Sequence, residues 1–140
     1  MAPPTILVVD DDVSIRTIVC AMLEPAGYEP VLASSAEEAI AQLDDGLKPR
    51  LILSDIVMTG MTGLALLDHV RERHAEIPIV MVSGVSDVAV AIGTLRNGAY
   101  DYLLKPFERD QLLGTVLRAL EYRALEIGRA SCRERVSSPV

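Results

Sequence analysis

A chain of 140 residues, half of them hydrophobic, is long enough for one domain with a substantial core and too short for a second folded domain. Its formal net charge of −7 argues against a nucleic-acid-binding surface, because phosphate backbones are held by clustered Lys and Arg. The two cysteines form no disulfide framework, and no run approaches the roughly 20 apolar residues of a membrane span. The segment MAPPTILVVDDD lacks the basic start of a secretory leader and its apolar run ends at Asp10, so we expect a cytoplasmic protein without a membrane partner.

Short apolar segments alternate with amphipathic ones along the chain. Segments that are apolar throughout suit the strands of a parallel sheet that is covered on both faces, because neither face of such a sheet meets water. We predict strands at 5–9, 28–33, 51–54, 77–83 and 99–104.

Apolar residues at helical spacing fill the segments between these strands. The first helix, with Ile15 and Met22 on its apolar face, ends near Gly27, a natural C-cap. The second opens with a capping box at Ser35, and the fifth spans about 108–125. Repeated strand–helix units require right-handed crossovers, which predicts a doubly wound α/β domain: a five-stranded parallel sheet with five helices on its two faces.

Polar side chains stand where four of the predicted strands end. Asp10 and Asp11 follow the first strand, Asp55 the third, Ser83 closes the fourth, and Lys105 follows the fifth. The carboxyl ends of parallel strands meet at one edge of the sheet, and open α/β sheets bind ligands in the crevice outside that edge. These residues therefore form the candidate site.

The residue types at this edge favour phosphoryl chemistry. Three carboxylates would repel one another unless a cation lay among them, and oxygen ligands alone favour Mg²⁺. With Mg²⁺ on Asp10 and Asp11, Asp55 can act as a nucleophile toward a phosphoryl group and form an aspartyl phosphate. Lys105 offers a charge and Ser83 a hydroxyl donor, both suited to holding phosphoryl oxygens.

Four motifs in the chain together resemble the receiver domain of two-component response regulators. They are ILVVDDDVSIR, LILSDIVMTGMTG, PIVMVSG and GAYDYLLKPF, and the resemblance covers about residues 5–125, with 126–140 outside it. The resemblance implies a flavodoxin-like sheet with the strand order 2-1-3-4-5.

The resemblance also implies a signalling switch and not an enzyme. Such a domain catalyses only its own phosphorylation and slow dephosphorylation. Asp55 would accept a phosphoryl group from a sensor histidine kinase, a phosphotransfer protein or a small phosphodonor. Mg²⁺ would be held by Asp10, Asp11, Asp55 and the carbonyl of Val57.

Further roles follow from the same resemblance. Ser83 and Lys105 would contact the phosphoryl group, and Ser83 and Tyr102 would act as switch residues that change the face formed by the fourth helix, fifth strand and fifth helix. The fourth and fifth helices would form a homodimer interface, and the Lys105–Pro106 peptide bond would be cis. The family positions that steer hydrolytic water hold Val57 and Val85 here, which predicts a long-lived phosphoryl state.

The loop after Asp55 departs from the family pattern Met-Pro-x-x-Asp-Gly. Here it reads MTGMTG over 58–63, with Thr59 in place of the proline and Thr62 in place of the acid, although Gly63 is kept. These replacements predict a more mobile loop with the phosphoryl-handling residues unchanged.

Two other functions fit parts of the sequence. A haloacid-dehalogenase-like phosphatase would use Asp10 and Asp12 after the first strand, but it leaves no role for Asp55 and has no later acidic pair. A flavodoxin-like flavin mononucleotide binder would need a hydroxyl-rich first loop, where this chain has three acids. Turnover of a phosphate monoester, a bound yellow flavin, or a stable aspartyl phosphate would distinguish the phosphatase, the flavin binder and the switch.

The remaining polar residues have simpler interpretations. Asp12 is expected to cap the first helix, since an acid there accepts hydrogen bonds from first-turn N–H groups. His69 and His74 lie on a polar helix face with no Cys or acid at metal-ligand spacing, so we expect both to be solvated. The segment 126–140 loses the apolar face, and 126–136 reads like a translated sequencing adapter, so we expect a non-native or disordered tail there.

Overall fold

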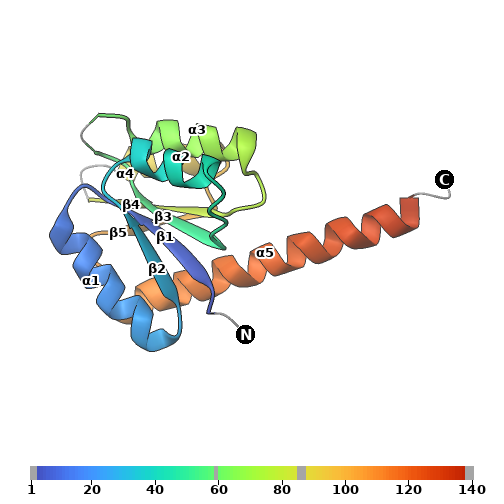
Figure 1. Cartoon of the computed structure of the whole chain (residues 1–140), viewed down its shortest axis with the longest axis horizontal. Helices are drawn as coiled ribbons and strands as arrows, with labels where there is room; N and C mark the ends of the chain where they lie inside the picture. Colours follow the sequence, from blue (N-terminus) through green and yellow to red (C-terminus); the bar gives the residue numbers. More distant parts are fainter. Residues whose placement is uncertain (1–2, 59, 85–87, 138–140) are drawn as a thin grey trace.

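A computed structural model of the chain describes residues 3–58, 60–84 and 88–137, with side chains up to residue 125 (Figure 1). Its five parallel strands form one sheet in the order β2-β1-β3-β4-β5. The strands are β1 (Thr5–Val9), β2 (Glu29–Ala33), β3 (Leu51–Asp55), β4 (Ile79–Ser83) and β5 (Asp101–Leu104). The predicted doubly wound sheet and its strand order are confirmed.

Helices cover both faces of this sheet (Figure 1). They are α1 (Val13–Leu23), the short 3₁₀ helix η1 (Glu24–Ala26), α2 (Ala36–Asp44), α3 (Gly63–Arg73), α4 (Val88–Arg96) and α5 (Arg109–Ser137). Side chains alternate between the two faces of each strand. Leu7 and Ile52 therefore pack toward α2 and α3, whereas Ile6 and Leu53 pack toward α1 and α5.

The observed elements differ from the predicted ones mainly at their ends. Asp55 is the last residue of β3, so the strand itself holds this carboxylate, one residue beyond the predicted strand end. The first helix ends at Leu23, and η1 carries the chain to Gly27, whose positive φ of 94° suits glycine.

The fifth helix is longer than we expected. We predicted an end near Leu125, and the backbone of α5 continues to Ser137 (Figure 1). Helix propagation adds one hydrogen bond per residue, and no proline interrupts 126–137, so the loss of the apolar face does not by itself end the helix. The non-native origin of 126–140 stays a prediction.

Strand register brings the polar residues to one edge of the sheet. Val9 pairs with Ser54, so Asp10 follows at the level of Asp55. Asp55 pairs with Val82, and Ser83 pairs with Leu104. Each polar residue therefore stands at or just beyond the end of its strand, beside the next one along the sheet.

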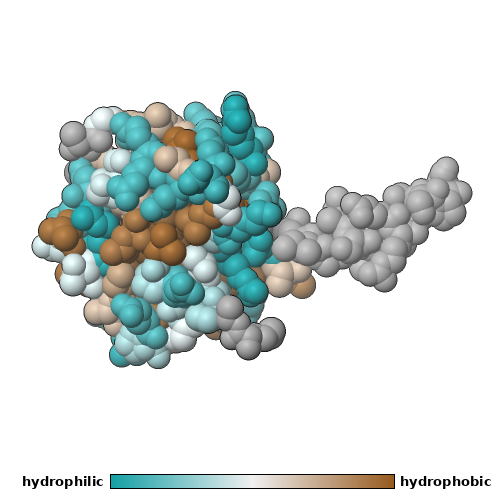
Figure 2. All heavy atoms as spheres, in the orientation of Figure 1, coloured by the Kyte–Doolittle hydropathy of each residue, from teal (hydrophilic) through white to brown (hydrophobic). Residues whose placement is uncertain are grey.

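The surface is largely hydrophilic on the face shown in Figure 2, with a hydrophobic strip near its centre, where the edge strand β2 runs in Figure 1. Leu32 of β2 is one of the exposed large apolar residues. In the part of the chain that the structure describes, we find no helix that combines the length and apolarity needed to span a bilayer.

Candidate functional site

Lys105 joins two of the predicted carboxylates at the carboxyl edge of the sheet. Its Nζ lies 3.1 Å from Asp10 Oδ2 and 3.4 Å from Asp55 Oδ2. The side chains of Asp10, Asp55 and Lys105 are 4%, 12% and 24% exposed, so these charges meet in a largely desolvated place. Charges interact more strongly where water is excluded, which makes this edge electrostatically distinct from an ordinary charged surface.

The loop after β1 holds Asp10 in place. The backbone N–H of Asp12 donates to Asp10 Oδ1 at 2.9 Å, and Arg16 Nη1 donates to the Asp10 carbonyl oxygen at 2.5 Å. Asp12 itself accepts from the N–H of Ser14 at 2.8 Å, which confirms its predicted role as the N-cap of α1. The consecutive acids therefore have different roles: Asp10 lies in the site, whereas Asp12 caps α1.

Asp10, Asp11 and Asp55 present carboxylate oxygens that all lie within 4.8 Å of one another. Asp10 is buried, Asp11 exposed and Asp55 half-buried. Burial raises the pKa of Asp55, and the negative charge of Asp10 raises it further, against the opposing effects of Lys105 and of the Val57 N–H, which hydrogen-bonds to the Asp55 carboxylate. Simultaneous ionisation of all three carboxylates is therefore unfavourable at this site unless additional positive charge is supplied.

Lys105 supplies one positive charge to this edge. Burial alone would favour the neutral amine, but the hydrogen bond to Asp10 and the charge of Asp55 outweigh it and raise the pKa of Lys105. The amine stays protonated, as a group that holds an anion must be. The peptide bond between Lys105 and Pro106 is cis, which confirms that prediction.

Ser83 ends β4 beside this charge cluster. Its side chain is buried, and among the described residues its Oγ has no hydrogen-bond partner. A buried hydroxyl without a partner is costly and uncommon, which points to a ligand oxygen that would complete it. The backbone N–H of Lys105 donates to the Ser83 carbonyl at 2.8 Å and links the ends of β4 and β5.

Val57 and Tyr102 take the remaining predicted positions. Val57 is 59% exposed, and its backbone N–H donates to the Asp55 carboxylate. Tyr102 is partly buried and packs against the core that faces α2 and α3, and its N–H donates to Asp101 Oδ1 at 2.8 Å. The metal-ligand role of the Val57 carbonyl and the switch role of Tyr102 stay predictions.

Gly63 packs against the backbone that carries Asp55. The sequence indicates a role for this glycine only because the motif keeps it. Its N–H donates to the Ile56 carbonyl at 2.9 Å. A Cβ at this position would overlap the Asp55 carbonyl oxygen and would lie 2.9 Å from Ile56 Cα. The first residue of α3 therefore packs directly against the backbone that carries Asp55.

Replacing Gly63 with alanine should lower the free energy of unfolding by about 1–3 kcal/mol or more, because the backbone of β3 has to shift. The measurement is the urea midpoint of the metal-free protein. Gly93→Ala in α4 is a matched control, since beyond its chain neighbours and the backbone of its own helix no described atom lies within 4 Å of the place that a Cβ would take. That control should be stabilising by about 0.5–1 kcal/mol, and equal midpoints in the two variants would contradict the close approach at Gly63.

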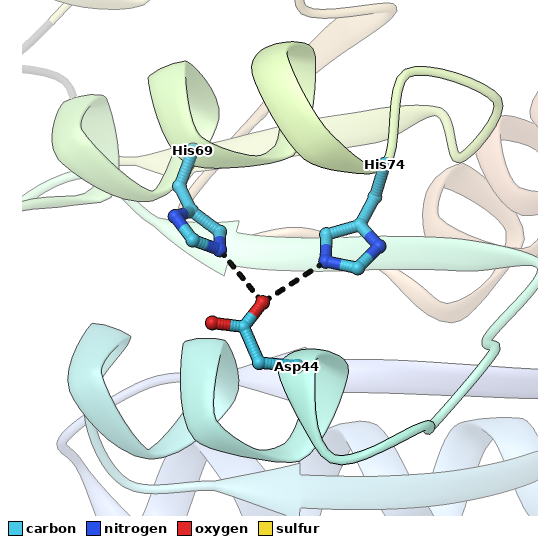
Figure 3. Close-up of side chains that lie close together, drawn as sticks. All are labelled: Asp44, His69 and His74. Carbon is cyan, nitrogen blue, oxygen red and sulfur yellow. Dashed lines mark hydrogen bonds and ion pairs between the residues drawn. The ribbon is translucent and has the colours of Figure 1, made fainter.

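Our interpretation of the two histidines was wrong. Both rings are largely buried, and Asp44 of α2 accepts hydrogen bonds from His69 and His74 at 3.0 and 3.3 Å (Figure 3). Asp44 precedes the histidines by 25 and 30 residues, so no local spacing joins them. The packing of α2 against α3 creates this cluster.

A hollow of about 690 Å³ lies at the other edge of the sheet, where β4 and β5 begin. Its lining includes Arg71, Pro78, Tyr100 and Tyr122. Volume does not identify a site on its own, and doubly wound sheets bind ligands at the carboxyl edge. We therefore assign the candidate site to the acidic edge.

Comparison with known proteins agrees with this geometry. A family model described as the response regulator receiver domain matches residues 6–117. The nitrogen assimilation regulatory protein NtrX of Azorhizobium caulinodans is 40% identical over 118 residues, which are 83% of this chain and 26% of that protein. The DNA-binding transcriptional regulator NtrC of Salmonella typhimurium is 39% identical over 115 residues, 82% of this chain and 24% of that protein.

Similarity extends to solved structures. The crystal structure of the receiver domain of NtrX from Brucella abortus matches with a TM-score of 0.79 and 44% identity, covering 83% of this chain and 98% of that one. By contrast, the chain spans about a quarter of the length of the curated relatives it matches.

Proposed function

The chain belongs to the response regulator receiver domain family, and from that membership we propose that it is a signalling switch phosphorylated on Asp55. The observation that carries this proposal is the convergence at one sheet edge of three carboxylates, a lysine that contacts two of them, and a buried hydroxyl that has no partner among the described residues. Each of these groups has a task in phosphoryl transfer. A purely structural role would not explain why all of them meet at one place.

In the proposed transfer, an ionised oxygen of Asp55 attacks phosphorus in line with the leaving atom of the donor. The new O–P bond forms as the bond to that leaving atom breaks, and the leaving atom keeps the electron pair. Lys105 Nζ, already directed at Asp55, neutralises charge on the phosphoryl oxygens, and Ser83 Oγ donates a hydrogen bond to one of them. Positioning and charge neutralisation supply most of the catalysis that such a transfer needs.

The residues at this edge fit a magnesium ion. Asp10, Asp11 and Asp55 form an oxygen-only donor set, and burial and then the charge of Asp10 raise the pKa of Asp55, an effect that a bound cation would oppose. We propose these carboxylates and the Val57 carbonyl as its ligands. When bound, Mg²⁺ would neutralise carboxylate charge and polarise the phosphoryl group.

Metal dependence is the first test of this proposal. Acetyl phosphate with Mg²⁺ should add one phosphoryl group to the intact chain, as followed by mass spectrometry, and omission of Mg²⁺ should stop the reaction. Asp10→Asn and Asp11→Asn should each weaken Mg²⁺ binding by about 10–100-fold or more, since each removes a ligand charge and even outer-shell losses reach that range. Unchanged Mg²⁺ affinity in both variants would refute the proposed metal site.

Asp12→Asn is the matched control for that experiment. It removes the same formal charge one residue away, and asparagine caps a helix as well as aspartate does. Phosphorylation should be retained. In a haloacid-dehalogenase-like phosphatase Asp12 would be essential, so loss of a phosphate-monoesterase activity in Asp12→Asn would favour that function instead. The structure uses Asp12 as a helix cap, which favours the switch.

The partners of this chain are proposed from the same membership. We propose a sensor histidine kinase or a phosphotransfer protein as the donor, and the cytoplasm as the compartment. Exposed apolar residues of α4, β5 and α5 support a docking or homodimer surface formed by these elements: Val90, Ile92, Leu104 and Leu117. Because two relatives are named as regulatory proteins of nitrogen assimilation and of transcription, we propose transcriptional control as the process that this switch serves.

A further inference from the structure

A second cluster of potential ligands lies on the helices that cover one face of the sheet. Asp44 is the last residue of α2, His69 lies on α3, and His74 is the C-cap of α3 (Figure 3). The Nε2 atoms of both rings point at the same oxygen, Asp44 Oδ1, at 3.0 and 3.3 Å. Helices of a doubly wound sheet start at its carboxyl edge and run back, so the ends of α2 and α3 lie away from the acidic site.

Local structure explains how the two histidines converge. They are five residues apart, and His74 leaves the helix with φ −139° and ψ 46°. Its N–H still bonds to the Val70 carbonyl at 2.7 Å, which ties the ring to the last turn of α3. The ring centroids are 5.9 Å apart and tilted by 42°, so the rings present adjacent nitrogen atoms without stacking.

The electrostatic setting favours a cation. Asp44 ends α2 and His74 caps α3, so the negative ends of two helix dipoles and one carboxylate lie together. In the absence of metal, the Nε2–H groups of both rings donate to this carboxylate. A bound metal ion would take the place of these two protons, and each neutral ring would then carry its proton on Nδ1.

We propose that Asp44, His69 and His74 form a binding site for a Zn²⁺-class transition metal ion that ties α2 to α3. Two imidazoles and one carboxylate are a donor set that suits zinc, whereas the oxygen-only acidic edge suits Mg²⁺. Tetrahedral ligand atoms about 2 Å from zinc are roughly 3.3 Å apart, close to the observed Oδ1–Nε2 separations.

Solvent reaches this cluster, and more of it reaches the carboxylate than the rings. The histidine side chains are 19% exposed, whereas that of Asp44 is 45% exposed. A metal ion held by these three side chains would therefore be accessible to a water molecule that completes four-coordination. Bound metal would join the ends of two helices and leave the carboxyl edge of the sheet unobstructed.

To test this proposal, the whole chain is first freed of metal with a chelator and then titrated with Zn²⁺ as the only probe. Excess Mg²⁺ is present throughout, so that it occupies the acidic edge. Calorimetry should give one Zn²⁺ per chain. His69→Gln, His74→Gln and Asp44→Asn should each weaken binding by about 10–100-fold or more. A rise in melting temperature with Zn²⁺ should appear in the unsubstituted chain and disappear in these variants, whose metal-free melting curves report whether they fold.

Controls separate this site from other places where zinc binds. Asp45→Asn removes the same charge one residue after Asp44 and should bind Zn²⁺ like the unsubstituted chain. Asp11→Asn should also leave Zn²⁺ affinity unchanged, as should Cys20→Ser combined with Cys132→Ser. Loss of binding in Asp11→Asn or in the cysteine variant, or equal affinity in all three ligand variants and the unsubstituted chain, would overturn the proposal.

Discussion

Replacing Asp55 with asparagine should abolish covalent phosphorylation of the chain by acetyl phosphate. The neutral amide cannot act as the nucleophile, and Lys105 loses the partner that lies 3.4 Å from its Nζ. Intact-mass spectrometry of the variant should show no added phosphoryl group. We expect no other single substitution in the chain to reduce phosphorylation as much. Asp12→Asn, with the same change of charge, should be phosphorylated normally.

The Asp55→Asn variant should remain folded. Because burial and Asp10 raise the pKa of Asp55 in the folded chain, its ionised form opposes folding at neutral pH in the absence of metal. Removing this charge should leave the metal-free melting temperature equal or higher. A phosphoryl group that still appears in this variant, mapped to Ser83 or Asp12 by peptide sequencing, would disprove the assignment of the acceptor.

The site was predictable from sequence because it depends on strand ends and register. Continuous apolar runs locate the strands, and a parallel sheet brings their carboxyl ends to one edge, so the positions of Asp10, Asp55 and Lys105 follow without detailed packing. Strand boundaries were less accurate, since Asp55 completes β3. The difference is one residue, and it leaves the carboxylate at the same edge.

The cluster of Asp44, His69 and His74 could not be predicted in this way. It depends on how the end of α2 lies against α3, and helix packing is set by many side chains rather than by a sequence spacing. Arg16, which donates to the Asp10 carbonyl, was missed for a similar reason: a charged residue in the first turn of a helix gives no signal of a backbone partner.

The altered loop after Asp55 shows how a departure from the family pattern is accommodated locally. Thr62, in place of the usual acid, is the N-cap of α3, and its Oγ1 accepts from the Ala65 N–H at 3.3 Å. A hydroxyl can satisfy a first-turn N–H as a carboxylate can. Thr59, which replaces the proline, lies outside the described residues. The entry to α3 is therefore fixed at Thr62 and Gly63, directly beside the backbone of Asp55.

The phosphorylated state should be long-lived, with a lifetime set by Val57 and Val85. Hydrolysis of an aspartyl phosphate requires a water molecule in line with phosphorus, and neither valine side chain can orient water by hydrogen bonding. Val57 is beside the acceptor and Val85 lies outside the described residues. In the Val57→Asn, Val85→Glu double variant, a gained hydrogen bond in the transition state is expected to accelerate decay by about 10–100-fold, since each 1.4 kcal/mol is tenfold in rate.

A single-site series separates water orientation from shielding. Val57→Ala removes bulk without adding a polar group, whereas Val57→Asn adds the polar group at similar volume. After phosphorylation and removal of the donor in excess Mg²⁺, decay should be faster in Val57→Asn than in Val57→Ala if orientation of water limits hydrolysis.

The altered loop acts in the opposite direction, because a more open site would already admit water in the unsubstituted chain. Val57 adjoins the acceptor and its N–H contacts the carboxylate, whereas the loop meets the site through the backbone near Gly63, so we expect the valine to dominate. Equal or slower decay in the double variant would show that these two positions do not control the lifetime.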